Sequence, residues 1–315
     1  MKSGSTDSAK WISAGAVVQG ATHIRQNKIC QDALYVHKGE DKPFALVCVA
    51  DGHGSDRCPF SDEGADAAVR VTAEILSEIL ESGDPKGTLT AQKDIRLPKL
   101  IEKEWKNAIK RIHEGKANDG IHSEKAQPGG IQPDEVHSDG VHPDAANSDD
   151  ADDSDTPDPA PPLPPFSYEL YGSTLLALAA APDYVFALQL GDGDAVAINP
   201  DGNARWLLPP SDHAGNETES LCMDDSWKYI RTQLIPLDGS APDNEPTMLL
   251  ISTDGYANSF VTGAGFLKAG ADIYRLWREN GCGYIEENLS GWLTHTSANG
   301  SGDDIAAAII AKDIR

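Results

Sequence analysis

The chain has 315 residues, of which 39% are hydrophobic, and its formal net charge is −24. This length suits one large α/β domain with an insertion, and the apolar content is enough for a sizeable core. The sequence has no basic surplus to displace counterions from phosphates. The charge therefore excludes nucleic acid and an anionic membrane surface as expected partners.

Two further features indicate a soluble, cytoplasmic protein. The first ten residues lack an apolar stretch of signal-peptide length, and the longest apolar runs are too short to span a bilayer. The five cysteines are odd in number, and no pair has the CxxC spacing of a zinc site. We therefore expect reduced thiols, most of them buried as small apolar side chains.

The first part of the chain predicts strands and then helices. Apolar, β-prone runs indicate three strands, the last two forming a hairpin, over residues 11–18, 33–36 and 44–50. Ser61 is the expected N-cap of a helix with an apolar stripe that reaches Leu80, and Pro85 with its neighbouring glycines ends this helix. A second amphipathic helix is expected over residues 98–114.

Residues 115–165 differ in composition from the rest of the chain. Apolar residues nearly vanish, and no Lys or Arg occurs between Asp134 and Asp158. Three approximate copies of a short unit are too polar to stack as a solenoid. We expect a disordered acidic insertion in a single domain that spans residues 1–315. A tolerated surface loop and a docking segment for a basic partner both remain open for it.

The second half returns to a globular pattern. The segment 209–225 is polar and predicts a loop, and two helices are expected over residues 263–278 and 284–296. Strands are expected over residues 173–180, 184–190, 195–199, 247–252 and 305–311. Strands and helices do not alternate as βαβ units, which favours an α+β layered fold with antiparallel sheets.

Several predicted strands end or begin at an aspartate beside a glycine or a second acid. These positions are Asp32, Asp51-Gly52, Asp192-Gly193, Asp254-Gly255 and Asp303-Asp304. One Asp-Gly alone is usually a plain turn. Clustered carboxylates, however, stay ionised only beside positive charge, and oxygen ligands suit Mg²⁺ or Mn²⁺. The ordered set therefore predicts a divalent metal centre.

Two such ions, about 3.5–4 Å apart, would share a carboxylate and a bridging water. The ions would lower the pKa of that water, so that hydroxide exists near neutral pH and attacks a phosphoryl group held in line. The leaving alkoxide then needs a proton. His53, next to the metal centre in sequence, is the candidate general acid.

The motif set resembles the metal-dependent protein phosphatases, the 2C-type serine/threonine phosphatases, in a bacterial branch of the family. Asp-Gly-His-Gly after a strand is fairly specific, and the full set in this order is strongly so. The blocks are Gln31-Asp32, Asp51-Gly52-His53-Gly54, Gly172-Ser173-Thr174, Gly191-Asp192-Gly193-Asp194, Ser252-Thr253-Asp254-Gly255 and Ser301-Gly302-Asp303-Asp304.

The resemblance implies an αββα sandwich with two Mg²⁺ or Mn²⁺ ions at one end, between two antiparallel sheets. It implies that Asp51 bridges the metals, helped by the Gly52 carbonyl, and that His53 is the acid. Asp254 and Asp303 would complete one metal's shell, and Asp32 would serve the other. The implied activity is hydrolysis of phosphoserine and phosphothreonine in proteins, by a monomer that opposes a serine/threonine kinase in signalling.

The chain departs from the family pattern around the substrate. The family's phosphate-binding Arg falls near Lys28 here, and Arg25 or His23 are the candidate substitutes. Asp192 is a candidate ligand of a weak third metal, since Asn258 stands where some members have an acid, and Asp194 replaces the usual Arg of that turn. These departures leave one alternative open, a pseudophosphatase that binds a phosphoprotein or another partner without turnover.

Overall fold

A computed structural model describes residues 10–37, 42–125, 162–209 and 218–313. It divides into two compact units, which are described separately here: residues 1–110 with 167–315, and residues 111–166. In the second unit, the rings of His113 and Phe166 meet edge to face with centroids 5.2 Å apart. All features below belong to the first unit.

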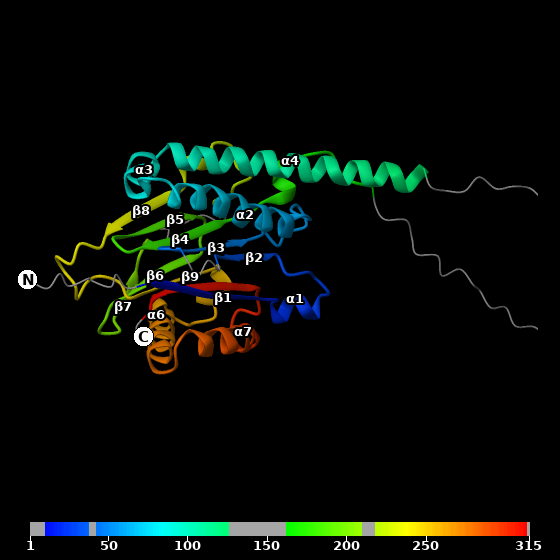
Figure 1. Ribbon diagram of the computed structural model, residues 1–315. Coiled ribbons are helices and arrows are strands. Elements are labelled where there is room, and N and C mark those ends of the chain that lie inside the picture. Colours follow the sequence, from blue (N-terminus) through cyan, green and yellow to red (C-terminus); the bar gives the residue numbers. More distant parts are fainter. Residues whose placement is uncertain (1–9, 38–41, 126–161, 210–217, 314–315) are drawn as a thin grey trace, which may run out of the picture. The chain divides into compact units, whose positions relative to one another are not determined.

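Two five-stranded antiparallel sheets form the centre of the first unit (Figure 1). The first sheet has the strand order β1 (Trp11–Val18), β10 (Ile305–Lys312), β9 (Met248–Ser252), β6 (Asp194–Ile198) and β7 (Ala204–Trp206). The second sheet has the order β2 (Asp32–Val36), β3 (Ala45–Asp51), β4 (Leu175–Ala181), β5 (Tyr184–Leu190) and β8 (Arg231–Pro236). The predicted α+β fold with antiparallel sheets is confirmed.

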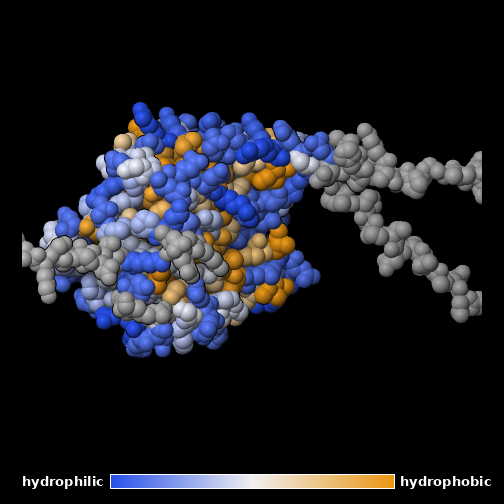
Figure 2. Space-filling view, viewed as in Figure 1, coloured by the Kyte–Doolittle hydropathy of each residue, from blue (hydrophilic) through white to orange (hydrophobic). Residues whose placement is uncertain are grey.

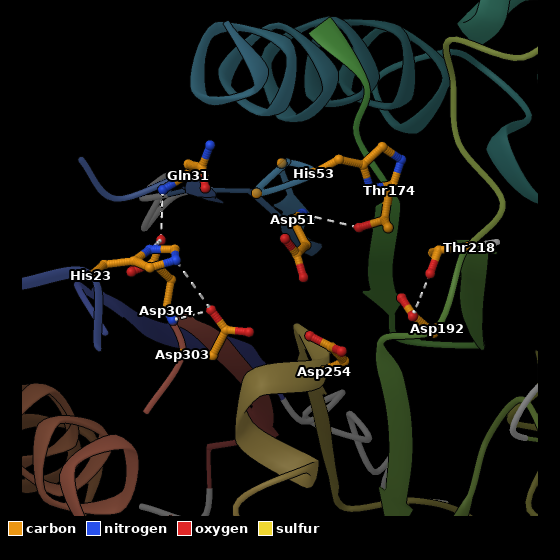
Figure 3. Close-up of a pocket in the computed structure, with 12 residues that line it drawn as sticks. His23, Gln31, Asp51, His53, Thr174, Asp192, Thr218, Asp254, Asp303 and Asp304 are labelled. Carbon is orange, nitrogen blue, oxygen red and sulfur yellow. Dashed lines mark hydrogen bonds and ion pairs between the residues drawn. The ribbon is translucent and has the colours of Figure 1, made fainter. Parts of the chain in front are cut away.

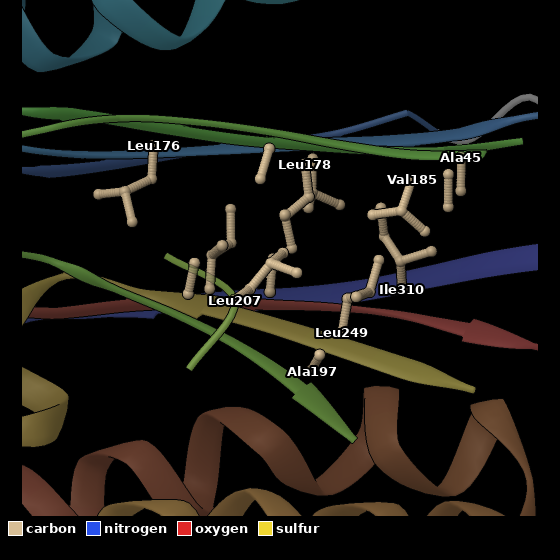
Figure 4. Close-up of a cluster of buried hydrophobic side chains, with 14 of the residues drawn as sticks. Ala45, Leu176, Leu178, Val185, Ala197, Leu207, Leu249 and Ile310 are labelled. Atoms are coloured by element: carbon tan, nitrogen blue, oxygen red, sulfur yellow. The ribbon is translucent and has the colours of Figure 1, made fainter. Parts of the chain in front are cut away.

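The space between the sheets is filled by alternate residues of their strands, as the period-two geometry of a strand requires (Figure 4). Leu176 and Leu178 of β4 face Leu249 of β9 and Ile310 of β10 in this layer. The intervening residues of the first sheet, such as Ile309, form a second core under the helices. Both faces of each sheet are thus covered, which explains why the strands are continuous apolar runs.

Helices cover the outer faces of both sheets (Figure 1). On the second sheet lies α2 (Ser61–Leu80), and α4 (Arg96–Lys125) packs on α2 through Trp105, whose indole N–H donates to the Gly64 carbonyl at 2.9 Å. On the first sheet lie α6 (Gly263–Asn280) and α7 (Cys282–Asn299). Figure 2 shows a largely hydrophilic surface over the start of α4. The short elements are α1 (Ala21–Arg25), α3 (Pro85–Gln92), α5 (Asp254–Ala257), η1 (Tyr168–Tyr171) and η2 (Ser226–Lys228).

The structure corrects several predicted helix ends. Ser61 is the first residue of α2 and not its cap; its hydroxyl instead accepts from the Gln31 side chain at 2.8 Å. Pro85 is the first residue of α3, and the Asp84 carboxylate accepts a hydrogen bond from the backbone of that helix's first turn. Pro85 therefore follows one helix and begins the next. The predicted helix over 98–114 starts earlier and continues to Lys125, into the expected insertion.

Other differences lie in short elements. Strands β7 and β8 and helix α3 were not predicted, because each is short and only weakly patterned. Most of the expected insertion, residues 126–161, lies outside the described residues. All five cysteines are free, but only Cys48 and Cys58 are buried, whereas Cys30, Cys222 and Cys282 are partly exposed, so the expectation that most of them are buried is wrong. Among the described residues, no helix combines the length and apolar character needed to cross a membrane.

Candidate metal centre

The aspartates singled out in the sequence meet at one end of the two sheets. Asp51, the last residue of β3, pairs in register with Asp32, the first residue of β2. In the other sheet, Asp194 pairs with Ser252 at the end of β9, and Asp254 follows two residues later. Asp303 precedes β10. Because both sheets end here, carboxylates distant in sequence become neighbours.

A cavity of ≈ 210 Å³ opens between these strand ends (Figure 3). The carboxylates of Asp51, Asp254 and Asp303 point into the same space. The lining residues are polar or glycine: His23, Gln31, Asp51, Gly52, His53, Gly54, Thr174, Asp192, Thr218, Asp254, Asp303 and Asp304. No Lys or Arg of the described chain is among them, so the cavity gathers negative charge without a basic side chain to balance it.

Two threonines hold the backbone of Asp51 and the carboxylate of Asp32. The backbone N–H of Asp51 donates to the Thr174 hydroxyl at 2.9 Å, and the Thr174 N–H donates to the Asp51 carbonyl at 2.8 Å. The Thr253 hydroxyl donates to the Asp32 carboxylate at 2.6 Å. Asp32 does not itself line the cavity, so it lies behind the residues that do. Both threonines belong to the motif blocks, but no pattern in these blocks predicted the two bonds.

Asp304 is a buried anchor of the N-terminal segment. Its side chain accepts from the backbone N–H of Gly20 at 2.6 Å and of Gln31 at 2.7 Å, and it lies 2.8 Å from Nδ1 of His23. Its neighbour Asp303 is half exposed and accepts from the Asp304 N–H at 2.9 Å. The two adjacent acids therefore differ in role. One ties the chain together while the other faces the cavity.

Gly255, next to Asp254, allows the backbone of α5 to lie against the backbone of Asp304. A Cβ on Gly255 would lie 2.1 Å from the Asp304 carbonyl oxygen, a distance that no side chain tolerates. The start of α5 therefore rests directly on the segment before β10. Asn258, one turn further along, donates to the Asp254 carboxylate at 2.9 Å. The Asp-Gly pair thus begins a short helix where the sequence suggested a turn, and its glycine serves packing.

Burial and mutual repulsion disfavour the charged form of these acids. Desolvation, followed by repulsion from Asp32 and Asp254, raises the pKa of Asp51 well above its ordinary value. Desolvation is also the main cause of the raised pKa of Asp32 and Asp254. Asp194 shares this environment, and burial with repulsion from Asp254 and Asp192 raises its pKa to about 7. Such groups need a cation or a proton.

This donor set fits hard divalent cations. The cavity offers several carboxylate oxygens and the Gly52 backbone, which are the ligand types of Mg²⁺ and Mn²⁺. Within the described part of the chain, no group of three or more His, Cys, Asp or Glu side chains stands in a finished metal-holding arrangement. The carboxylates of Asp51, Asp254 and Asp303 nevertheless face one space.

His53 lines the cavity beside the carboxylates. Its backbone N–H donates to the Gly172 carbonyl at 3.0 Å, which fixes the turn after β3. Burial lowers the pKa of the imidazole, and the nearby Asp192 carboxylate opposes this shift. Asp192 in turn accepts from the Thr218 hydroxyl at 2.8 Å. No motif pointed to Thr218, which enters the cavity from a polar loop.

The three candidate phosphate-binding residues differ in whether they line the cavity. His23 lines the cavity, with Nε2 3.7 Å from an Asp303 oxygen. Arg25 does not line it, and its guanidinium donates to the Thr22 hydroxyl at 2.9 Å on the exposed side of α1. Lys28 also lies outside the lining. Its backbone carbonyl accepts from the Gln19 amide. Of the three, the cavity therefore includes only His23.

Comparison with known proteins now assigns a family. The family model for protein phosphatase 2C matches residues 19–294, most of the chain. The chain belongs to the protein phosphatase 2C family. The matched range includes Asp32, Asp51, Asp192 and Asp254 and ends before Asp303. No curated protein gives a significant match in sequence.

Solved structures share the fold at low sequence identity. A serine/threonine phosphatase of S. agalactiae aligns with a TM-score of 0.50 and 14% identity, over 96% of this chain and 100% of that chain. PppA, a regulatory component of the T6SS in Pseudomonas aeruginosa, aligns with a TM-score of 0.51 and 13% identity, over 97% and 99%. The catalytic domain of the phosphatase PstP in complex with two manganese ions aligns with a TM-score of 0.51 and 13% identity, over 96% of this chain and 97% of that chain. These likenesses concern the fold, while the family model supports phosphatase function.

Proposed function

We propose that the protein hydrolyses phosphoserine and phosphothreonine in proteins with two Mg²⁺ or Mn²⁺ ions. The observation that carries the proposal is the convergence of Asp51, Asp254 and Asp303, from both sheets, on one cavity with no Lys or Arg in its lining. Clustered carboxylates with raised pKa values are the expected metal-free state of such a centre. The substrates would be phosphoproteins made by a serine/threonine kinase.

In this proposal, Asp51, Asp254 and Asp303 would hold the ions from the cavity lining, and Asp32 would support them from behind it. When bound, the ions would polarise the phosphoryl group and make the attacking water more acidic. Thr174 and Thr253 hold Asp51 and Asp32 at their backbone and carboxylate, respectively, and so keep these ligands from turning away.

The chain's own residues supply the remaining steps. His53 would donate a proton to the leaving serine or threonine oxygen, since an alkoxide is a poor leaving group. The Asp192 carboxylate favours the protonated imidazole that this step requires. His23 is oriented by Asp304 and is the candidate contact for the substrate phosphate. Asp192 is also the candidate ligand for a weak third metal.

The experiment compares wild type with D51A in the presence of Mn²⁺. Wild type should hydrolyse p-nitrophenyl phosphate and a phosphothreonine peptide, and D51A should lose about a hundredfold or more of kcat/KM. Asp201 is a matched control, because it also precedes a glycine at a turn but lies outside the cavity lining. D201A should keep full activity. Equal rates for wild type and D51A would refute the proposal.

A direct titration tests the metal count and the finer parts of the proposal. Calorimetry with Mn²⁺ should give two sites in wild type and fewer in D51A, with D201A unchanged. The same samples, measured by light scattering, test the expected monomer. A single site in wild type would contradict the two-metal centre even if some turnover were found. The proposal also places the enzyme in the cytoplasm as one phosphatase domain, interrupted by an insertion at residues 115–165.

A further inference from the structure

Helix α4 is bonded through two paired side chains to a segment that reaches the cavity at Thr218. Glu102 accepts from the Lys106 ammonium at 2.6 Å, one turn along the helix. The second Glu102 oxygen accepts from the backbone N–H of Trp227 at 2.9 Å. Lys106 also donates to the Met223 carbonyl at 3.2 Å. Both charges are therefore bonded to residues 218–227, which we term the wall segment.

The other end of the wall segment reaches the site. Thr218 donates to Asp192 at 2.8 Å, and both line the cavity. The Ser220 hydroxyl accepts from the Ser173 N–H at 3.0 Å and donates to the Ser173 carbonyl at 3.1 Å. The wall segment is thus bound to the residues that lead into β4 on one side and to α4 on the other.

Cys222 brings the wall segment close to His53. A Cβ built on Gly172 would lie 2.5 Å from Cδ2 of His53 and 3.3 Å from the sulfur of Cys222. The His53 ring and the Cys222 thiol therefore both lie close to the position that a side chain at Gly172 would occupy. Cys222 is followed directly by Met223, whose carbonyl Lys106 holds. A shift at α4 therefore has a short route to the imidazole.

The burial of the pair distinguishes it from the other helical ion pairs of the described chain. The side chains of Glu102 and Lys106 are 11% and 19% exposed. The i,i+4 pair of Asp66 and Arg70 on α2 is 54% and 73% exposed. Exposed ion pairs contribute little to folding stability. A buried charge, by contrast, is tolerated only where hydrogen bonds and an opposite charge compensate it. Here those bonds go to the backbone of the wall segment.

We propose that Glu102 and Lys106 are positioning residues that hold the wall segment against His53. This inference rests on the proposed function, because it assigns the pair to proton delivery by His53. A misplaced acid slows the departure of an alkoxide but hardly affects p-nitrophenolate, which leaves without protonation. The pair should therefore matter for phosphothreonine and not for p-nitrophenyl phosphate.

The test replaces both charges at once, since removing one would leave the other buried and unpaired. E102L/K106M keeps apolar volume on α4, and D66L/R70M is the matched control on α2. Hydrogen exchange should become faster at the Trp227 amide and across the wall segment in E102L/K106M alone. With Mn²⁺, its kcat for a phosphothreonine peptide should fall roughly tenfold, while that for p-nitrophenyl phosphate stays within about twofold.

Unchanged exchange at Trp227, or equal losses on both substrates, would overturn the positioning role. If E102L/K106M fails to fold, E102Q/K106M replaces it, because this variant also removes both charges and leaves only a neutral, weaker acceptor for the Trp227 amide. E102Q/K106M should show a smaller change in the same direction, and no change at Trp227 would again refute the role. If wild type turns over neither substrate, the proposed function fails, and the exchange comparison alone decides the positioning role.

Discussion

The buried Asp304 carboxylate bonds to several residues far away in the sequence. It is 3% exposed and receives hydrogen bonds from two backbone N–H groups of distant segments, as well as contacting His23. Removing it would leave these donors buried without a partner, and that cost exceeds the net value of the bonds themselves. Asp304 therefore contributes to the site by keeping α1 and Gln31 in place.

D304A should lower the free energy of unfolding by about 3 kcal/mol. Urea denaturation of the metal-free protein measures this. D303A changes the adjacent acid, whose side chain is 51% exposed, and should change the free energy of unfolding by under about 1 kcal/mol in either direction. Similar losses for the two variants would show that Asp304 is not the anchor that its contacts indicate.

Asp194 gives a pH-dependent prediction. Its pKa is raised from 3.8 to about 7, mainly by burial. Below about pH 4 the carboxyl is protonated in both states. Between pH 4 and pH 7 it ionises in the unfolded chain but stays protonated in the folded one, so the free energy of unfolding falls as the pH rises. Above about pH 7 the carboxyl is ionised in both states, and the folded protein carries the full cost of burying its charge.

D194N removes this penalty, because Asn stays neutral at every pH. In the presence of a chelator, D194N should exceed wild type in unfolding free energy by on the order of 2 kcal/mol at pH 8, and by nothing at pH 4. Denaturant titrations at the two pH values measure the difference. A gain of equal size at pH 4 would mean that ionisation is not its cause.

At this scale the sequence predicted which acids gather, but not what holds them. The strand-end aspartates were recognisable because a motif block follows or precedes each apolar run. Thr218 and Glu102 were not, because their roles depend on loop and helix contacts between positions far apart in the chain. The family resemblance singled out Asp303, but no pattern of residues predicted that the adjacent Asp304 would be buried and would bond to the N-terminal segment.

At the scale of elements, strand periodicity explains both the successes and the failures. Long apolar runs such as 184–190 matched their strands, because burial on both faces leaves little ambiguity. The short strands β7 and β8 are exposed or half-buried and carry no such signal. The extension of α4 to Lys125 passes through polar residues with glycines, which local propensity disfavours in a helix.

The alternation in β10 leads to a packing prediction. Ala308 faces the space between the sheets, whereas Ala307 faces the helices. Both are fully buried, so a larger side chain at either position must displace its neighbours. A308L should lower the free energy of unfolding by about 1–3 kcal/mol. Thermal and urea unfolding would measure the loss, and a stable variant would indicate space in the layer that the packing does not show.

At the scale of the whole molecule, both metal binding and screening of the net charge affect folding stability. A chain with net charge −24 is stabilised by any salt that screens repulsion, so a specific effect of Mn²⁺ must be separated from a general one. Ligands that bind only the folded state raise stability by mass action, by about 2.7 kcal/mol at a hundred times Kd.

Mn²⁺ should therefore raise the Tm of wild type by several degrees at pH 7.5, and a chelator should reverse the change. D51A at the same ionic strength reports the screening contribution and should show a much smaller rise. Equal shifts in both proteins would attribute the effect to screening alone.

The candidate metal-binding carboxylates come from both sheets, which has a consequence for how this protein can change. Asp51 ends β3 of one sheet, Asp254 follows β9 and Asp303 precedes β10 in the other, and without cations their mutual repulsion disfavours the charged form of this cluster. Substitutions that neutralise these positions would yield a sturdier protein that no longer works. Selection for stability alone would therefore favour the loss of these carboxylates, and only a requirement for activity would oppose it.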